Sequence, residues 1–300
     1  MTVLALEVGP TRIAAIEIAD DVGPDQVKQI PVPERQTWER VRELMQDIAA
    51  GRDIKAVGIA SGGPIDMSSG VVAPSHISDW EAGFPLVDSM EKLFPAATVA
   101  LALDGVCLSL AERHFGGTRE VMDSLAMYVS EAIVGGVMVG GFVVVGRTGN
   151  AGQIGHVLVP GYDVPCSCGG RGCLEAVAGG AALVKWANGQ GWGGASVEAL
   201  VAAAGEGQQV AISALERAGT ALGRAIASVA ALLDIDRVVV GGPVTAAGAL
   251  LWKPLQNAIA MHARLPFLPG LRAIPSELGD LGLLAGAGVL ALSSIQQQQS

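Results

Sequence analysis

The sequence has few positive charges and no run of them. Lysine and arginine total 19 of 300 residues, against 29 acidic residues, and the formal net charge is -10. A protein that binds nucleic acid through its phosphates needs a clustered basic surface. We therefore expect no direct binding to DNA or RNA.

Long apolar runs and a signal peptide are also missing. Glycine, proline and charged residues interrupt every apolar stretch before the roughly 18 residues that span a bilayer. The first residues, MTVLALEVGP, lack the positively charged start of a secretion signal and include Glu7. We expect a cytoplasmic protein that does not bind membranes.

Cysteine is scarce, yet three of the four cysteines lie within eight positions: Cys166, Cys168 and Cys173. They follow His156 in a glycine-rich stretch, CSCGGRGC, whose turns can bring three thiolates to one point. Three sulfurs and one imidazole form the closed tetrahedral set that is typical of structural zinc. The alternative, three ordinary core cysteines, is less compatible with such clustering. Cys107 lies apart, and we expect it to be a buried apolar residue.

Half of the residues are apolar, which is enough for a large core, and the length favours two domains. Two β-rich regions, one around Val3–Leu6 and Ile13–Ile18 and one around Ser124–Ser130 and Val134–Val145, each lead into helical patterns. This repetition predicts two α/β lobes that enclose a cleft. We expect an N-terminal lobe over residues 1–118, a C-terminal lobe over 119–295 and a disordered tail over 296–300.

Periodicity and turn residues predict the remaining elements. The predicted helices are Trp38–Ala50, Val87–Phe94, Val106–Arg113, Leu174–Ala187, Val197–Ala204, Ala211–Leu233, Ala247–Ala260 and a last helix, Leu281–Leu292, that can pack back on the N-terminal lobe. The further predicted strands are Ala56–Ala60, Val99–Leu103 and Asp236–Gly242. Asp104 follows one of these strands, where it suits either a general base or the cap of the next helix.

The segments GQIGH and CSCGGRGCLE resemble the signature of the ROK family, which includes bacterial glucokinases, N-acylhexosamine kinases and sugar-responsive repressors. Other stretches are similar to family segments in the same order: LEVGPTRIAAIEI to the first phosphate loop, ASGGPID to the sugar-side turn, LALDG to the catalytic segment, SEAIVGG to the second phosphate loop and VVVGGPV to the adenosine loop. The resemblance implies a two-lobed hexokinase and actin-like fold with an interlobe cleft. It also implies transfer of a phosphoryl group from Mg-ATP to a hexose or hexosamine, with Asp104 as the general base.

On the sugar side, the resemblance implies that the ligand contacts Gly63, Leu103, Asp104, Gln153, His156 and Glu175. His156 would bind zinc and offer its other ring nitrogen to a sugar hydroxyl. Gln153 stands where the family has Glu, Leu103 replaces an Asn, and His76 occupies another position where Asn is frequent. These departures predict that the sugar differs from glucose.

The nucleotide side departs further from the family. Its residues are Glu7, Gly9, Pro10, Thr11, Ser130, Glu131, Ala132, Gly241, Gly242 and Pro243. Pro10 replaces a glycine and removes a backbone N–H donor, and Pro243 crowds the adenosine loop. Glu131 places a carboxylate where the family has a hydroxyl, whereas Glu7 keeps the charge of the Asp that it replaces near magnesium. We expect weakened ATP binding.

Two hypotheses for the function stand side by side. The chain is either a sugar kinase that uses Mg-ATP, with polyphosphate as another phosphoryl donor to consider, or a non-catalytic sugar sensor that acts through a partner protein. Because the first predicted strand starts at Val3, we expect no preceding DNA-binding segment of the kind that family repressors carry. A zinc hydrolase is disfavoured, because four protein ligands leave no position for water. By family analogy we expect a homodimer.

Overall fold

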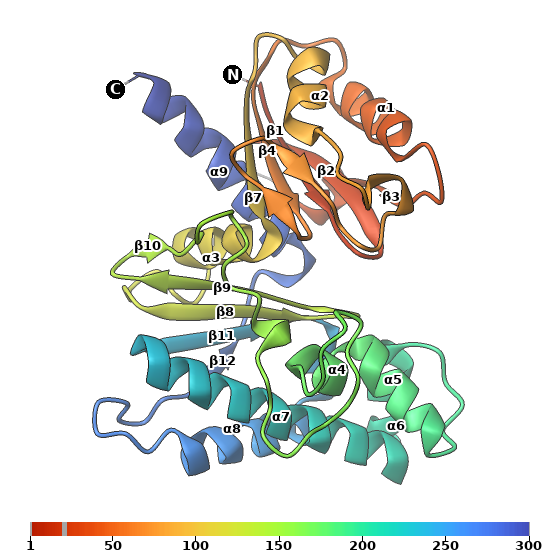
Figure 1. Ribbon diagram of the computed structural model, residues 1–300, viewed down its shortest axis with the longest axis vertical. Coiled ribbons are helices and arrows are strands. Elements are labelled where there is room, and N and C mark those ends of the chain that lie inside the picture. Colours follow the sequence, from red (N-terminus) through yellow and green to blue (C-terminus); the bar gives the residue numbers. More distant parts are fainter. Residues whose placement is uncertain (1, 20–22, 300) are drawn as a thin grey trace. The chain divides into compact units, whose positions relative to one another are not determined.

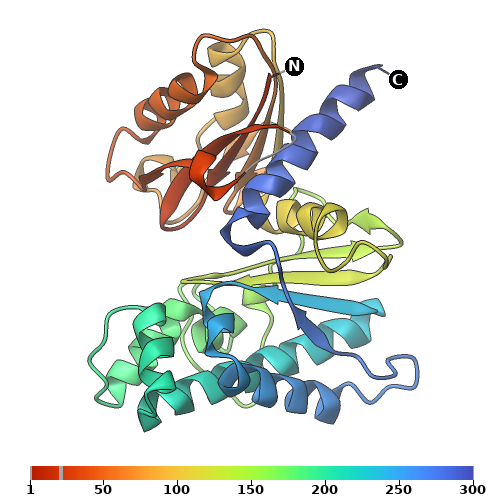
Figure 2. The ribbon, with the colours of Figure 1, turned by 180° about the vertical axis from the view of Figure 1, so that it is seen from behind.

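The computed structural model describes residues 2–19 and 23–299. The chain forms two compact units, which Figures 1 and 2 show from opposite sides. Unit 1 comprises Met1–His114, Val144–Gly152 and Asp280–Ser300, and unit 2 comprises Phe115–Val143 and Gln153–Gly279. The lobe boundary at residues 118 and 119 stays a prediction.

Unit 1 is built on a five-stranded sheet in the order β3-β2-β1-β4-β7. Its strands are β1 (Thr2–Val8), β2 (Arg12–Ile18), β3 (Lys28–Pro31), β4 (Ile54–Ser61) and β7 (Thr98–Leu103). β1 pairs antiparallel with β2, whereas β1, β4 and β7 are parallel. The central strand β1 is buried from Val3 to Val8, because helices cover both faces of the sheet. Two short strands, β5 (Ile65–Asp66) and β6 (Val71–Val72), form a separate ribbon that was not predicted.

The helices of unit 1 lie on the two faces of this sheet. α1 (Thr37–Ala49) and α2 (Leu86–Leu93) cover one face, and α9 (Gly282–Gln299) covers the other and packs against α3 (Asp104–His114) (Figures 1 and 2). Short 3-10 turns complete the chain: η1 (Pro24–Gln26), η2 (Ser78–Trp80), η3 (Ile154–His156), η4 (Pro243–Ala247) and η5 (Gly279–Leu281). Cys107 of α3 is fully buried, which confirms its prediction as a core residue.

α9 is a core helix that is packed through glycines. A Cβ atom on Gly286 would lie 1.8 Å from the Cys107 carbonyl oxygen, so that only glycine lets the two helices approach so closely. Among the described residues, Gly279–Gln296 is the one segment long and apolar enough to cross a membrane, but it packs on β1 and β4. The expected disorder over 296–300 is replaced by helix as far as Gln299, since glutamine continues a helix readily. Ser300 lies outside the described residues.

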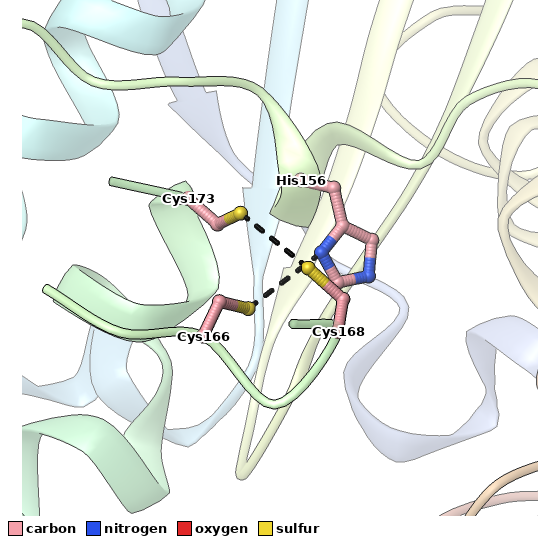
Figure 3. Close-up of side chains that lie close together, drawn as sticks. All are labelled: His156, Cys166, Cys168 and Cys173. Atoms are coloured by element: carbon pink, nitrogen blue, oxygen red, sulfur yellow. Dashed lines mark hydrogen bonds between the residues drawn. The ribbon is translucent and has the colours of Figure 1, made fainter. Parts of the chain in front are cut away.

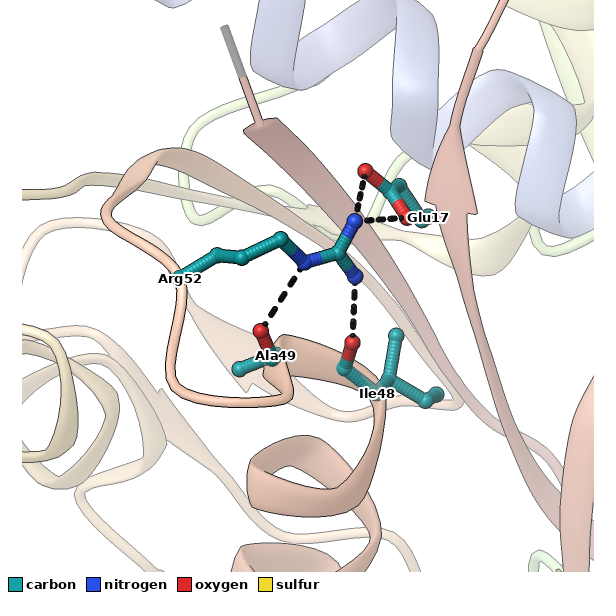
Figure 4. Close-up of polar contacts among 4 residues, drawn as sticks. All are labelled: Glu17, Ile48, Ala49 and Arg52. Atoms are coloured by element: carbon teal, nitrogen blue, oxygen red, sulfur yellow. Dashed lines mark hydrogen bonds and ion pairs between the residues drawn. The ribbon is translucent and has the colours of Figure 1, made fainter.

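Arg52 fastens the end of α1 to β2 (Figure 4). Its guanidinium donates to both carboxylate oxygens of Glu17, at 2.7 and 2.6 Å, and to the carbonyls of Ile48 at 2.8 Å and Ala49 at 3.1 Å. The last carbonyls of a helix have no partner within the helix. Arg52 supplies that partner, and the left-handed backbone of Ala50 and Gly51 ends α1 and turns the chain toward β4.

Unit 2 repeats the strand pattern of unit 1. Its sheet has the order β10-β9-β8-β11-β12, formed by β8 (Ser124–Val129), β9 (Ile133–Val139), β10 (Phe142–Val143), β11 (Arg237–Gly241) and β12 (Ala273–Pro275). Again an antiparallel hairpin is followed by two parallel neighbours. The helices are α4 (Leu174–Ala178), α5 (Gly180–Gly189), α6 (Val197–Gly205), α7 (Gln209–Leu233) and α8 (Ala249–His262), with α7 and α8 side by side (Figures 1 and 2).

Two predicted elements of unit 2 are divided in the structure. The run Val134–Val145 breaks into β9 and β10 at Gly140 and Gly141, which adopt φ values of 59° and 81° in a tight turn. The predicted helix Leu174–Ala187 breaks into α4 and α5 at Gly179, which has extended backbone angles. Periodicity missed both breaks, because the apolar spacing continues across them. The short strand β12 was not predicted.

Candidate active site and metal centre

The three parallel strands of unit 1 end at the same edge of the sheet. The strand register pairs Val8 with Ser61 and Ser61 with Leu103, so the residues that follow, Gly9, Gly62 and Asp104, emerge together. The Gly62 N–H donates to the Val8 carbonyl at 3.0 Å and holds two of these turns against each other. The carboxyl ends of parallel strands are where α/β proteins place ligands.

Asp104 lies at this edge directly after the outermost strand, β7, as the first residue of α3. Its Oδ1 accepts a hydrogen bond from the Gly105 N–H at 2.7 Å. Its Oδ2 lies next to the sugar-side turn, 3.9 Å from the point that a Cβ on Gly62 would occupy. One oxygen therefore serves the start of the helix and the other lies at the turn, so both roles left open by the sequence are compatible with this geometry.

His76 lies in the same corner, which we define by the turns at Gly9 and Gly62 and by Asp104. Its Cε1 lies 3.1 Å from the Cβ position of Gly62, and its ring bonds to the Gly9 backbone. Burial lowers the pKa of His76, and the hydrogen bond to Gly9 opposes this effect only in part. The neutral imidazole is therefore favoured. Its Nε2 is buried without a hydrogen-bond partner among the described residues. The corner thus holds a buried imidazole nitrogen whose hydrogen-bonding capacity is unused among the described residues.

Glu7, predicted to lie near magnesium, is buried under the first loop. It is 5% exposed, and its Oε2 accepts a hydrogen bond from Arg12 Nη2 at 3.2 Å. Burial raises the pKa of Glu7, and the Arg12 charge opposes this without cancelling it. Arg12 also donates to the Asp280 carbonyl at 3.0 Å. Arg12 was not predicted as a site residue, although its position just after the loop residue Thr11 was a signal.

In unit 2 the second loop and the adenosine loop also share one edge. β8 and β11 are parallel, with Tyr128 opposite Gly241, so that the residues after each strand lie side by side. Gly242 has a φ of 98°, and a Cβ there would lie 2.3 Å from the Val129 carbonyl oxygen. Glycine is therefore required at this position, and Pro243 starts the 3-10 turn that follows.

The second loop uses its carbonyl groups to hold the start of α5. The Ser130 carbonyl accepts from the Gly180 N–H at 2.7 Å, and the Glu131 carbonyl accepts from the Ala181 N–H at 3.3 Å. The first N–H groups of a helix are the donors that usually bind phosphates, and these two are already used. Burial, with Glu198 adding a smaller contribution, raises the pKa of the half-buried Glu131 side chain.

The structure brings His156, Cys166, Cys168 and Cys173 together in unit 2 (Figure 3). Their four ligand atoms all lie within 4.8 Å of one another, with Cys168 Sγ 3.8 Å from Cys173 Sγ and Cys166 Sγ 3.9 Å from His156 Nδ1. Zinc bonds of about 2.3 Å to sulfur and 2.0 Å to nitrogen give tetrahedral edges of about 3.6 to 3.8 Å. The group fits a four-coordinate ion of that size.

Local hydrogen bonds explain why this segment converges. The Cys166 N–H donates to the Gly170 carbonyl at 2.9 Å, and the Gly172 N–H donates to the Val164 carbonyl at 2.9 Å. Burial raises the pKa of the Cys173 thiol to about 12, and the neighbouring Cys166 and Cys168 thiols add to the shift. Such a thiol ionises readily only beside a cation, which matches a metal-ligand role.

The remaining predicted sugar residues differ in their surroundings. Glu175 Oε2 accepts from the Ile133 N–H at 3.0 Å and so connects α4 to the second loop. His156 and Gln153 are exposed, and His156 turns Nδ1 toward the thiols, which leaves Nε2 on the other side of the ring (Figure 3). Leu103 is 1% exposed within β7 and presents no polar group. Its role as a sugar contact stays a prediction.

A model of the ROK family matches residues 3–294 of this sequence. The chain belongs to the ROK family. An N-acetylmannosamine kinase of Escherichia coli O7:K1 is 33% identical over 294 residues, which cover 97% of this chain and 99% of that protein. Because this alignment covers nearly the whole of both proteins, it includes the predicted phosphate loops, the sugar turn and the cysteine segment of this ROK chain.

Solved ROK structures have the same fold. A ROK hexokinase from Thermus thermophilus is 28% identical, with a TM-score of 0.82 and coverage of 99% of this chain and 100% of that one. A ROK family glucokinase from Streptomyces griseus, solved with glucose and AMPPNP, has a TM-score of 0.85 at 24% identity and covers 98% of this chain and 100% of its own. The predicted hexokinase and actin-like α/β fold of two repeated units is confirmed.

Proposed function

We propose that this ROK chain is a sugar kinase that transfers the γ-phosphoryl group of Mg-ATP to a hexose or hexosamine, with an N-acylated hexosamine as the first substrate to test. The observation that carries the proposal is Asp104, a carboxylate at the end of a buried parallel strand with one oxygen beside the sugar-side turn. The N-acetylmannosamine kinases at about 33% identity support the choice of substrate.

In this mechanism Asp104 accepts the proton of the sugar hydroxyl as that oxygen attacks the γ-phosphate. The unpartnered His76 Nε2 accepts a hydrogen bond from a second hydroxyl and helps to orient the ring. Magnesium, when bound with ATP, neutralises the charge that develops on the phosphates. Glu7 would help to hold that ion through a carboxylate that it shares with Arg12.

We assign Zn²⁺ to His156, Cys166, Cys168 and Cys173. Four protein ligands complete the tetrahedron, so that the ion has a structural role and leaves no position for a reacting water. Its function is to hold the loop before α4, and through it His156 and Glu175, in one arrangement. The His156 ring nitrogen that faces away from the ion is then available to a sugar hydroxyl.

A second candidate, a sugar sensor without kinase activity, is favoured by the second loop. Glu131 places a carboxylate near the position of a phosphate, and the first two N–H groups of α5 already bond to loop carbonyls. Pro10 removes a further donor from the first loop. These features predict weak ATP binding and leave the sugar-binding residues untouched.

The decisive experiment is a coupled assay for ADP release with MgATP and a panel of N-acetylmannosamine, N-acetylglucosamine, mannose and glucose. Sugar-dependent ADP release that Asp104→Asn abolishes is the expected result. Thermal stabilisation by a sugar, without ADP release and without stabilisation by MgATP, would instead favour the sensor. To test a polyphosphate donor, polyphosphate replaces MgATP and the sugar phosphate that forms is measured directly.

A further inference from the structure

A pocket of about 500 Å³ lies within unit 2, beside the metal-binding segment. Its walls come from the turn around Cys166 and Ser167, from one face of α5 and from Arg217 of α7. It reaches Glu131 of the second loop and Glu175 of α4, but none of its lining residues comes from the adenosine loop. It is therefore a space distinct from the positions assigned to the nucleotide base.

Two cations line this pocket, Lys185 of α5 and Arg217 of α7. Arg217 lies with its guanidinium carbon 4.6 Å from the ring centre of Tyr162 and 5.8 Å from that of Trp186. Its Nε is buried without a hydrogen-bond partner, and neither Arg217 nor Lys185 forms an ion pair within the part of the chain that the structure describes. A partly buried guanidinium without an anion beside it is costly unless a ligand supplies that anion.

The same pocket is also lined by two acidic residues, Glu131 of the second loop and Glu175 of α4. Glu175 Oε2 accepts from the Ile133 N–H at 3.0 Å, which places it next to the second loop. The first residues of α5 bond to that loop, and Lys185 and Trp186 of the same helix line the pocket. Acidic, basic and aromatic side chains therefore share one cavity.

Each part of this lining matches one part of a sugar phosphate. A phosphate accepts from lysine and arginine, ring hydroxyls donate to carboxylates, and the C–H face of a sugar packs on an aromatic ring. A free hexose leaves the cations unpaired, and inorganic phosphate leaves the carboxylates without donors.

We propose that this pocket is a second ligand site, which binds a small sugar phosphate with its phosphate on Lys185 and Arg217 and its hydroxyls on Glu131 and on Glu175, a residue that it shares with the predicted sugar site. The ligand would touch both the second loop and the metal-binding turn, which makes it a regulator of the sugar and nucleotide sites. The proposal does not rest on kinase activity, because no residue of unit 1 takes part in it.

The test is calorimetric titration of the zinc-loaded chain with N-acetylmannosamine 6-phosphate, with glucose 6-phosphate, with free N-acetylmannosamine and with inorganic phosphate. Lys185→Gln and Arg217→Gln are expected to weaken the binding of a sugar phosphate at least about tenfold, the scale of a lost charge-assisted hydrogen bond. Lys253→Gln, an exposed lysine of α8, is the matched control and should bind as the wild type does. Because Lys185 is exposed, its variant tests the pocket even if Arg217→Gln folds poorly.

Two further results would overturn the proposal. Binding that Asp104→Asn abolishes and Lys185→Gln leaves intact would place the sugar phosphate at the proposed catalytic site. Binding of inorganic phosphate as tight as that of the sugar phosphates would remove the sugar from the assignment. Each of these binding results can be interpreted even if the chain shows no kinase activity.

Discussion

Replacing Glu131 by threonine tests whether this single carboxylate limits nucleotide binding. For a phosphate oxygen about 4 Å away, two like charges repel by about 4 kcal/mol at an effective dielectric of 20 and by about 1 kcal/mol in water. Because the Glu131 side chain is only half-buried, solvent screening reduces this to about 2 kcal/mol. The new hydroxyl adds a hydrogen bond worth about 1 kcal/mol. Together these changes predict that ATP binds roughly 30- to 150-fold more tightly.

The assay is direct titration of MgATP into wild type and Glu131→Thr, with the zinc content of both proteins matched. Glu131→Gln removes the charge without restoring the hydroxyl, so it should recover the larger part of the gain. Glu206→Thr makes the same change at an exposed residue just after α6 and serves as the control. It should leave the affinity unchanged.

An unchanged ATP affinity in both Glu131 variants would refute the repulsion argument. The two occupied N–H groups of α5 and the missing donor at Pro10 would then be the causes of weak binding, since neither depends on the charge of residue 131. Equal gains in Glu131→Thr and Glu206→Thr would show that only the net charge of the protein matters.

Four further predictions concern Glu131, the candidate metal site, Asp104 and the packing of α9. Because the pKa of Glu131 is raised, its charge is lost at a higher pH than in an ordinary glutamate, so ATP affinity relative to Glu131→Gln should rise as the pH falls from about 8 toward about 5. Cys168→Ser should lower zinc content, melting temperature and sugar affinity together. Cys107→Ala is the control, and elemental analysis should find its zinc unchanged. A Cys168→Ser protein that lacks metal but binds sugar normally would show that sugar binding does not depend on the metal. Asp104→Asn should lower kcat by about 10²- to 10⁴-fold with sugar binding retained, while Asp88→Asn, which removes an exposed ion pair with Lys92, should match the wild type in the coupled assay. Gly286→Val should reduce the free energy of unfolding by about 3 kcal/mol or more because its side chain would overlap the α3 backbone, and Gly205→Ala, which meets no neighbour, should be close to neutral in denaturant unfolding.

Much of the candidate site was predictable because it depends on short stretches of chain. Cys166, Cys168 and Cys173 lie within one glycine-rich turn, so their spacing alone indicated that their sulfurs would meet, and the structure brings them together with His156. Asp104 was predictable because a residue directly after a parallel strand emerges at the edge of the sheet where the neighbouring strands also end. In each case local backbone geometry decides the position.

Other features depend on partners far away in the sequence. Arg12 lies only five residues from Glu7, but no nearby residue predicts that it also bonds to the Asp280 carbonyl, 268 residues further along. The break between α4 and α5 arises where the Gly180 N–H meets the Ser130 carbonyl, and hydrophobic periodicity carries no signal for such a contact. The pocket between Cys166, Lys185 and Arg217 likewise needs three separate segments.

The sequence by itself determined the family, the repeated α/β pattern and the four side chains of the candidate metal site, because these follow from local spacing and from periodic burial. Only the tertiary structure decided which charges are compensated: Glu7 has Arg12, whereas Glu131 lies near another carboxylate and Arg217 has no ion-pair partner among the described residues. The physical reason is that burial and charge pairing are set by contacts across the fold, which residue order does not specify.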